Sequence, residues 1–255
     1  MESMETRQKR ISALLPTEVA AFRIYGETDS TNTRARVYAA EGGAVPALFI
    51  ADSQSAGRGR TGKSFYSPRG TGLYASLLLP AKPESAVYMT TAAAVAVHRA
   101  IKSVTEISTD IKWVNDLYLK GKKVAGILCE SMFVGERGYV IIGFGINIST
   151  SAFPKELSNT ATSLGLFGNT PIADLLAAAC AEELIAVWKS GLTPSLLFEY
   201  KQNSAVLGRN IVYTENGVSH EGIATDIDRE GRLSVRLTDG RVVSLSSGEI
   251  SVRLI

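Results

Sequence analysis

The residue pattern of this chain changes near Gly208, and the change limits the folds that the chain can adopt. Beyond that point three turn dipeptides, Asn216-Gly217, Glu230-Gly231 and Asp239-Gly240, separate short stretches in which apolar and polar residues alternate. Such dipeptides favour tight hairpin turns, and the alternation is typical of half-buried strands. The tail therefore predicts a small all-β barrel or sandwich of about 45 residues, joined to the rest at Gly208 as a hinge.

The longer first part mixes helical and strand patterns, so we expect an α+β fold with two domains, residues 1–208 and 209–255. Apolar runs and helical periodicity mark the elements. Strands are predicted at 22–25, 47–51, 73–79, 111–113, 117–119, 124–130 and 139–148, and helices at 32–41, 85–102, 171–189 and beyond 194. Ser30 or Thr31 would cap the first helix. Residues 1–18 are predicted to form a polar arm.

Composition excludes several classes of protein. The net charge of +2 gives no global reason to expect nucleic acid or a membrane surface, and no apolar run reaches the roughly 18 residues that a membrane span needs. Cys129 and Cys180 are predicted to be buried free thiols in a reducing cytoplasm. His98 and His220 are isolated in the sequence and are not expected to be catalytic, and no cluster of metal-ligating residues appears.

The densest functional signal is the segment 54–63, in which Gln54 and Lys63 flank Arg58, Arg60 and three glycines. Glycine lets the backbone approach a ligand, and arginine stays charged and binds carboxylates and phosphates bidentately. The segment predicts a mobile loop that closes over an anionic ligand, with a solvated surface loop as the alternative. Its glycine spacing matches a dinucleotide-binding fingerprint, but that reading is rejected because no helix follows directly.

Three further segments combine polar residues with strands or a helix start. Each has a structural alternative: a capping cluster at 29–32, a hairpin with a basic turn at 112–127, and a glycine bulge at 143–147. The functional readings are hydrogen-bonding groups for a polar ring at the first, and at the second a carboxylate, Asp116, suited to a magnesium-bound phosphate. Lys123 begins an apolar strand, so its amine is predicted to reach inward to an anion.

Taken together and in order, these segments resemble the biotin protein ligase family. The resemblance covers about residues 22–255, and any single motif is weak while the ordered set is strong. It runs through Asp-Ser-Thr-Asn at 29–32, Gln-Ser-Ala-Gly-Arg-Gly-Arg at 54–60, Ser-Pro-x-Gly at 67–70, Lys-Trp-x-Asn-Asp at 112–116, Lys-x-Ala-Gly-Ile-Leu-x-Glu at 123–130, Gly-x-Gly-Ile-Asn at 143–147 and Gly-Glu-Ile-Ser at 248–251.

The resemblance implies a catalytic core related to class II tRNA synthetases and lipoate ligases, with a mixed β-sheet, flanking helices and a small SH3-like C-terminal barrel. It implies ATP and biotin as substrates with Mg²⁺, and a two-step reaction. Biotin is first converted to biotinyl-5′-AMP with release of pyrophosphate. A lysine of a biotin carboxyl carrier protein, a domain of acetyl-CoA carboxylase, then accepts the biotin.

The resemblance also assigns roles to residues. Arg58 and Arg60 would hold the adenylate, Lys123 would contact the biotin carboxylate, and Asp116 would lie near magnesium and the incoming lysine. The remaining residues expected to bind biotin or the nucleotide are Ser30, Thr31, Asn32, Gln54, Gly57, Gly59, Phe65, Trp113, Asn115, Gly126 and Asn147. Two positions depart from the family pattern: Val114 stands where proline is frequent, and Phe65 where tryptophan is common.

Alternatives remain open. A lipoate or octanoyl ligase on the same core is the nearest, and a non-catalytic biotin-sensing module differs in class. Some family members carry an N-terminal DNA-binding domain. Only about 20 residues precede the first expected strand here, fewer than a helix-turn-helix domain needs, so we expect a monofunctional, cytoplasmic ligase that binds neither DNA nor membrane. The resemblance leaves a homodimer open.

Overall fold

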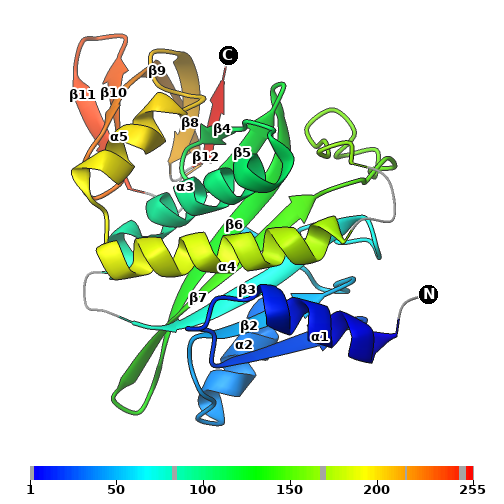
Figure 1. The fold of residues 1–255 in the computed structure, drawn as a ribbon. Coiled ribbons are helices and arrows are strands. Elements are labelled where there is room, and N and C mark those ends of the chain that lie inside the picture. The colour runs from blue at the N-terminus through cyan, green and yellow to red at the C-terminus, as the bar shows by residue number, and fades with distance from the viewer. Residues whose placement is uncertain (1–2, 82–84, 167–170, 216, 247–250, 255) are drawn as a thin grey trace.

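A seven-stranded mixed sheet forms the centre of the protein (Figure 1). The structure, a computed structural model, describes residues 3–81, 85–166, 171–215, 217–246 and 251–254. Only β1 and β2 pair in parallel; the other neighbours are antiparallel. In spatial order the strands are β1 (Ala21–Tyr25), β2 (Ala47–Ala51), β3 (Gly72–Pro80), β7 (Arg137–Asn147), β6 (Lys122–Val134), β5 (Asp116–Leu119) and β4 (Asp110–Lys112). All seven lie where the sequence predicts strands.

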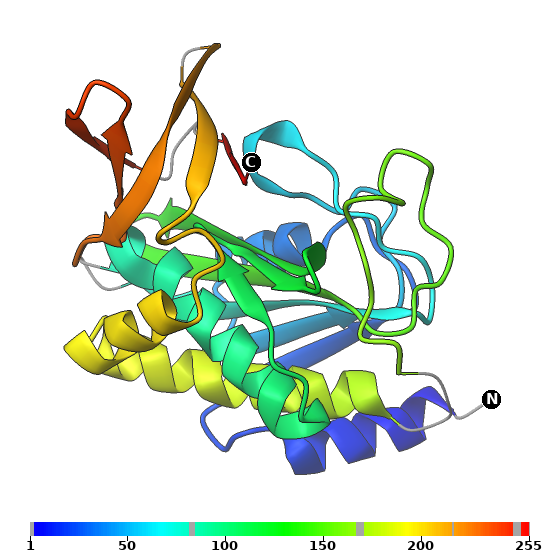
Figure 2. The same cartoon turned by 90° about the horizontal axis from the view of Figure 1, so that it is seen from above.

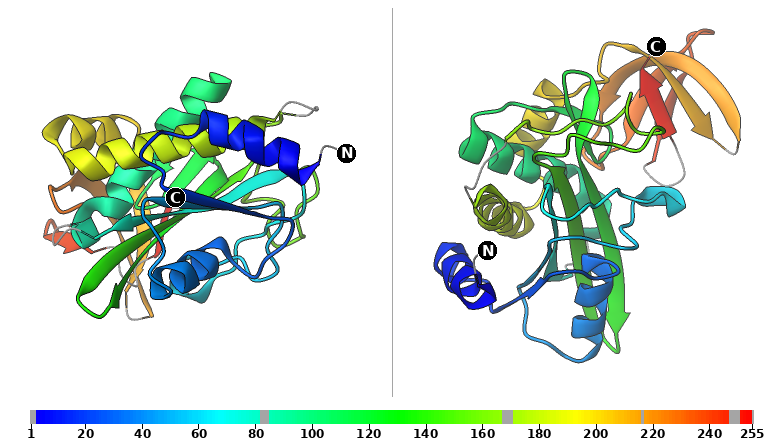
Figure 3. Two further views of the ribbon diagram at one scale, coloured as in Figure 1. Left: turned by 60° about the horizontal axis from the view of Figure 1, so that its bottom comes forward. Right: turned by 90° about the vertical axis from the view of Figure 1, so that its right-hand side faces the viewer.

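Helices cover the two faces of this sheet unequally (Figures 1 and 3). On one face lie α3 (Ser85–Thr105) and α4 (Ile172–Ser190), which are apolar where they meet the sheet and each other. The shorter α5 (Pro194–Gln202) packs on α3, and the Thr193 hydroxyl accepts from the Leu196 N–H at its start. On the other face, α2 (Thr31–Ala40) is the one α-helix among the described residues. Much of that face is therefore left for loops, and the candidate site lies there.

The predicted polar arm is wrong: residues 4–14 form a helix, α1 (Met4–Leu14), that packs on α4. Its Ile11 is buried, with 1% of its surface exposed. Its arginines pair with the Asp174 carboxylate on α4, with nitrogen–oxygen distances of 3.0 Å for Arg7 and 2.5 Å for Arg10. Arg7 also pairs with Asp52, which follows β2. The charges that suggested a solvated arm are thus the partners of a buried carboxylate, which sequence spacing does not reveal.

Neutralising this carboxylate is expected to loosen the helix. Asp174→Asn leaves two guanidinium groups facing an amide, and because both arginines are partly exposed we expect a loss of about 2 kcal/mol in the free energy of unfolding. Urea denaturation followed by circular dichroism measures it. The control is Glu5→Gln, which removes an exposed pair with Lys9 on the same helix. Equal stability of Asp174→Asn and the native protein would contradict the assigned role.

The tail forms a separate antiparallel sheet, as predicted, with the order β11-β10-β9-β8-β12. Its strands are β8 (Asn210–Glu215), β9 (Val218–Ile227), β10 (Leu233–Leu237), β11 (Val242–Leu245) and β12 (Ser251–Leu254). Gly231 and Gly240 lie at turns with φ of +76° and +88°, which glycine adopts without strain. Asn216 and residues 248–250 of the Gly-Glu-Ile-Ser motif lie outside the described residues.

The two sheets share one continuous apolar core. The indole Nε1 of Trp113 donates to the backbone oxygen of Gly231 at 2.9 Å, and Lys201 of α5 pairs with Asp226 of β9 at 2.6 Å. Gly208, at the junction, has φ of +75° and its N–H donates to the Ala224 carbonyl. The tail (orange to red) lies at the end of the molecule opposite to helix α1 (blue) (Figure 2).

The histidines and cysteines that are isolated in the sequence lie on strands and helices of the fold, His98 on α3, His220 on β9, Cys129 on β6 and Cys180 on α4. His98 is buried and hydrogen-bonds to Thr109 at 2.9 Å, while His220 stacks on Tyr213. Cys129 and Cys180 are both free, and burial raises the pKa of the Cys129 thiol to about 12. Both cysteines are free as predicted, but Cys180 is buried whereas Cys129 is only half-buried, so the predicted burial is confirmed for Cys180 alone. Among the described residues, none of the helices is long and apolar enough to cross a membrane.

Candidate active site

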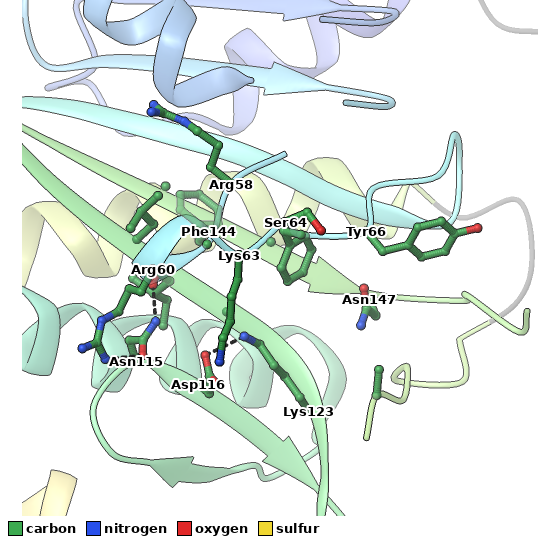
Figure 4. A pocket seen from close by; sticks show the side chains of 18 of the residues that line it. Arg58, Arg60, Lys63, Ser64, Tyr66, Asn115, Asp116, Lys123, Phe144 and Asn147 are labelled. Atoms are coloured by element: carbon green, nitrogen blue, oxygen red, sulfur yellow. Dashed lines mark hydrogen bonds and ion pairs between the residues drawn. The ribbon is translucent and has the colours of Figure 1, made fainter. Parts of the chain in front are cut away.

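A cleft of about 390 Å³ opens on the sheet face that α2 covers only in part (Figure 4). It gathers the start of α2, the glycine–arginine loop, the β4–β5 turn, and the middle of β6 and β7. Fourteen of the fifteen residues expected to form the site line it: Ser30, Thr31, Asn32, Gln54, Arg58, Gly59, Arg60, Phe65, Trp113, Asn115, Asp116, Lys123, Gly126 and Asn147. Gly57 is the exception; it supports the loop, where its carbonyl accepts from the Phe65 N–H at 2.9 Å.

The floor of the cleft is made of strand glycines without side chains. A Cβ on Gly143 would come within 2.1 Å of Asn32 Oδ1, one on Gly145 within 2.4 Å of the Phe65 ring, and one on Gly126 within 2.9 Å of Lys123 Nζ. Gly143 and Gly145 pair without a register shift on both sides of β7. The alternative of a glycine bulge at 143–147 is therefore wrong: these glycines make room for Asn32 and Phe65.

One end of the cleft is a tight polar cluster. The side-chain oxygen of Gln54 accepts from the Thr31 N–H at 2.8 Å and from the Thr31 hydroxyl at 3.2 Å. The side-chain nitrogen of Gln54 donates to the Ser67 hydroxyl. The Ser76 hydroxyl lies 2.7 Å from Thr31 Oγ1 and 2.6 Å from Asn32 Oδ1. Ser30 is the N-cap of α2, but its side chain makes no capping bond, and Gln54 serves the first helical N–H instead. The cluster presents oriented donors and acceptors to a polar ring.

Lys123 and Asp116 meet in the middle of the cleft. Their Nζ and Oδ1 atoms are 2.7 Å apart, and Lys123 Nζ lies 5.8 Å from the centre of the Phe65 ring. Segment 112–127 is the predicted hairpin, β5 joined to β6, so the structural and functional readings hold together. The neighbouring Lys122 points the other way and donates to the Ser158 carbonyl at the surface. A register shift between the Leu117–Ala125 and Tyr118–Lys123 pairs interrupts the alternation along β6, so Lys123 shares the cleft face with Gly126.

Arg60 enters the cleft from the loop and meets Asn115. Its guanidinium donates to Asn115 Oδ1 at 3.2 Å, and Asn115 in turn donates to the Ile127 carbonyl at 2.6 Å. Burial lowers the pKa of Arg60 and the charge of Asp116 opposes this, so the group keeps its charge. The Trp113–Val114 peptide beside them is cis, and the buried Tyr200 hydroxyl donates to the Val114 carbonyl.

Asn147 offers an acceptor that the described residues do not satisfy. Its Nδ2 donates to the Thr162 carbonyl at 3.0 Å, while its Oδ1 is buried without a hydrogen-bond partner. Buried polar atoms in native proteins are nearly always paired. A ligand that brings an N–H donor to this end of the cleft would complete the pairing.

Sequence reasoning missed two parts of the site. The segment 153–161 closes one side of the cleft through Phe153, Leu157, Thr160 and Ala161. Two backbone hydrogen bonds of 2.8 Å hold it to β6: the Lys123 N–H donates to the Thr160 carbonyl, and the N–H of the following Thr162 donates to the Lys123 carbonyl. It carries no strand or helix pattern that would have marked it. Glu130, quoted within a motif but given no role, hydrogen-bonds to Asn32 and pairs with Arg58.

The cleft does not contain a preformed metal site among the described residues. Asp116 is the one carboxylate among its described lining residues, and no group of three acidic, histidine or cysteine side chains is placed to hold an ion. A single carboxylate suits a Mg²⁺ ion that is held mainly by ligand phosphates and water. The donor set therefore fits an ion that arrives with a nucleotide.

Comparison with known proteins places this fold and cleft. The family model "Biotin/lipoate A/B protein ligase family" matches residues 27–147, and the model "Biotin protein ligase C terminal domain" matches residues 206–253. The fold and cleft thus define the class of biotin and lipoate protein ligases. A biotin–[acetyl-CoA-carboxylase] ligase of Mycobacterium tuberculosis is 30% identical over 239 residues, covering 89% of this chain and 87% of that one. The chain belongs to the biotin protein ligase family.

Two further comparisons describe its extent. A bifunctional ligase/repressor BirA of Bacillus spizizenii is 37% identical over 204 residues, which cover 76% of this chain but 62% of that one, so this chain spans less than two thirds of that relative. The structure of a biotin protein ligase from Aquifex aeolicus in complex with biotin and ATP aligns over 92% of this chain and 100% of that one, with a TM-score of 0.77 and 25% identity.

Proposed function

We propose that this protein is an ATP-dependent biotin protein ligase that forms biotinyl-5′-AMP and transfers biotin to a lysine of a carboxyl carrier protein. One observation carries the proposal. The cations Arg60 and Lys123 line one cleft together with a glycine floor, the Thr31–Gln54 polar cluster and the unsatisfied Asn147 oxygen. The cleft thus offers groups for a polar ring, for a charged centre and for a nucleotide, which an acyl-adenylate would use together.

In this arrangement the ring end of biotin binds at Ser30, Thr31 and Gln54, where the ureido group finds donors and acceptors. Its carboxylate lies at Lys123. The nucleotide lies toward Asn115 and Asn147, and the adenine amino group supplies the missing donor to Asn147 Oδ1. Mg²⁺, when bound, would neutralise charge on the phosphates, and Asp116 would be the protein carboxylate that helps to hold it.

The residues then serve two displacements. A biotin carboxylate oxygen attacks the α-phosphorus and the bond to pyrophosphate breaks; Arg60 and Lys123 stabilise the negative charge that develops on the phosphate oxygens. In the second step Asp116 attracts the ammonium group of a carrier lysine and accepts its proton. The resulting amine attacks the acyl carbon, the acyl–phosphate bond breaks and AMP leaves. The loop excludes water from the mixed anhydride between the two steps.

The wider assignment rests on the same proposal. Residues 1–208 form the catalytic domain and 209–255 the C-terminal domain, which the match of the second family model over residues 206–253 supports. The partner is a carrier domain of acetyl-CoA carboxylase, as the name of the Mycobacterium relative suggests. Two free cysteines support a cytoplasmic location, and a net charge of +2 supports action without DNA. Sedimentation velocity measures whether the protein forms the homodimer that the resemblance leaves open.

Substrate-dependent exchange of pyrophosphate into ATP tests the first step. We expect exchange with biotin and none with lipoate or octanoate. Exchange with lipoate alone would instead make the protein a lipoate ligase. Incubation with ATP, biotin and a carrier domain, followed by a streptavidin blot, separates a ligase from a biotin-sensing module, because only a ligase labels the carrier.

The glycine floor gives a specific prediction for Gly145→Ala. The added methyl group meets the Phe65 ring at 2.4 Å, so the ring must leave its place beside Lys123. We expect the Kd for biotin in the presence of ATP to rise about tenfold, which corresponds to about 1.4 kcal/mol, while the fold persists. Isothermal titration calorimetry measures the affinity. Gly26→Ala, outside the cleft lining, is the control, because a Cβ there meets only the Arg69 side chain at an ordinary 3.8 Å. An unchanged Kd in Gly145→Ala would argue against the floor.

A further inference from the structure

The two loop arginines point to opposite sides of the loop (Figure 4). Arg60 reaches into the cleft toward Asn115, whereas Arg58 turns toward α2 and pairs with Glu130 at 3.1 Å. The side chains of this Arg58–Glu130 pair are 42% and 20% exposed. A guanidinium bonded to a half-buried carboxylate is anchored rather than free to follow a ligand.

Glu130 is placed to connect three elements. It follows Gly126 and Leu128 on the same face of β6, since side chains alternate along a strand, so it stands at the edge of the cleft floor. One carboxylate oxygen accepts from Asn32 at 2.7 Å and from Arg58, and the other pairs with Arg36 of α2 at 3.1 Å. The sheet, the helix start that bears the polar cluster, and the loop thus meet at one side chain.

The loop geometry makes Arg58 an effective point of attachment. The backbones of Arg58 and Ser64 form an antiparallel β-bridge across the loop, and the Gly59 N–H donates to the Lys63 carbonyl at 2.6 Å. Between these bonds residues 60–62 form a single turn. Fixing Arg58 therefore fixes the whole tip, including the place from which Arg60 enters the cleft. A second cavity of about 380 Å³ behind the tip is lined by Arg58, Lys63, Leu128 and Glu130, so packing alone does not hold the tip down.

We propose that Glu130 is a positioning residue that fastens the glycine–arginine loop to the sheet through Arg58, which leaves Arg60 to contact the ligand. The Arg58–Glu130 pair acts as a latch between the loop and the sheet. In the enzyme, and here the inference rests on the proposed function, the latch slows the escape of the adenylate. It does not contribute to forming it, because Glu130 does not touch the reacting atoms.

Limited trypsin digestion without ligand tests the latch directly. Trypsin cleaves after Arg58, Arg60 and Lys63, so the rate of cleavage in this segment reports how often the tip detaches. Glu130→Gln keeps an acceptor for Asn32 but removes the charge. We expect cleavage in this segment to become about fivefold faster, because the loss of a partly exposed ion pair changes an equilibrium by about that factor. Arg36→Gln removes the other partner of the same carboxylate without touching the loop, and its cleavage should stay within about twofold of native.

Salt and a second variant guard against a purely structural effect. Added salt should speed cleavage of the native protein and leave Glu130→Gln unchanged relative to a small peptide substrate, because screening acts only where the pair exists. Arg58→Gln should speed cleavage after Arg60 and Lys63 equally, and the double variant should be no faster than either single one. Native-like cleavage in both single variants, or additive effects in the double variant, would overturn the latch.

The enzymatic arm separates this inference from the proposed function. With biotin and ATP, Glu130→Gln should release free adenylate about fivefold faster than native with an unchanged rate of adenylate formation. A lowered rate of formation would make Glu130 part of the chemistry and overturn its positioning role. If neither the native protein nor any variant formed the adenylate, the ligase assignment would be refuted. The digestion result would still decide whether the latch exists.

Discussion

Lys123→Ala is expected to slow biotinyl-adenylate formation by two to three orders of magnitude, about 3–4 kcal/mol in the activation free energy. Its ammonium group is the inward cation nearest to the Phe65 ring and the glycine floor, and no described neighbour on β6 substitutes for it. Alanine leaves the negative charge that develops on the transferred group without its partner. Single-turnover formation of the adenylate from ATP and biotin, quenched and resolved by chromatography, measures the loss.

Lys122→Ala is the matched control for this variant. Lys122 is adjacent in sequence and carries the same charge, but it points outward to the Ser158 carbonyl. Its removal should leave the rate of adenylate formation within about twofold of native, since an exposed lysine contributes little. If Lys123→Ala and Lys122→Ala behaved alike and both kept the native fold, the inward lysine would have no part in activating biotin.

Arg60→Gly is expected to separate formation of the adenylate from its retention. The Arg60 guanidinium closes the cleft by bonding to Asn115, and glycine removes this bond and loosens the loop. Loss of a bond to a charged group is worth about 1.5–3 kcal/mol, so escape of the adenylate should accelerate roughly ten- to a hundredfold. The free adenylate then acylates lysines of proteins that the cleft does not select.

Bystander labelling measures this leak. Serum albumin incubated with the variant, ATP and biotin should carry biotin on streptavidin blots, and with the native protein it should not. Arg69→Gly is the control, because Arg69 lies in the same connection and its one ion pair with a described residue is the exposed pair with Glu27 at 3.8 Å. Equal selectivity of Arg60→Gly and the native protein would remove the retaining role of Arg60.

The strands of both sheets were predictable because their signals are local. Apolar runs, alternating patterns and glycine turns depend on neighbours in the sequence, and every predicted strand of the central sheet is present. Helix α1 was missed for the opposite reason. Its stability depends on Asp174, which lies far along the chain, and on the burial of Ile11 against α4. The local signals in residues 1–18, the N-cap Ser3 and Glu5 in the first turn, do not reveal the partner on α4 that holds the helix in place.

The same distinction applies to the cleft. Residues on compact motifs, such as Gln54 and Lys123, were identified because charged and polar groups interrupt apolar or glycine-rich sequence. The segment 153–161 was missed because backbone hydrogen bonds with Lys123, which any sequence can make, hold its lining side chains beside the cleft. Glu130 was missed as a functional residue because its role depends on Arg58 and Arg36 converging from two other segments. The opposed directions of Arg58 and Arg60 likewise follow from their partners, not from their spacing.

A crystal structure of the protein with biotin and ATP tests the central claim most directly. We predict the biotin ring against Thr31 and Gln54, its carboxylate or the acyl phosphate at Lys123 and Arg60, and the adenine amino group within hydrogen-bond distance of Asn147 Oδ1. An occupied ligand site elsewhere, with the loop raised and solvent in this cleft, would contradict the account.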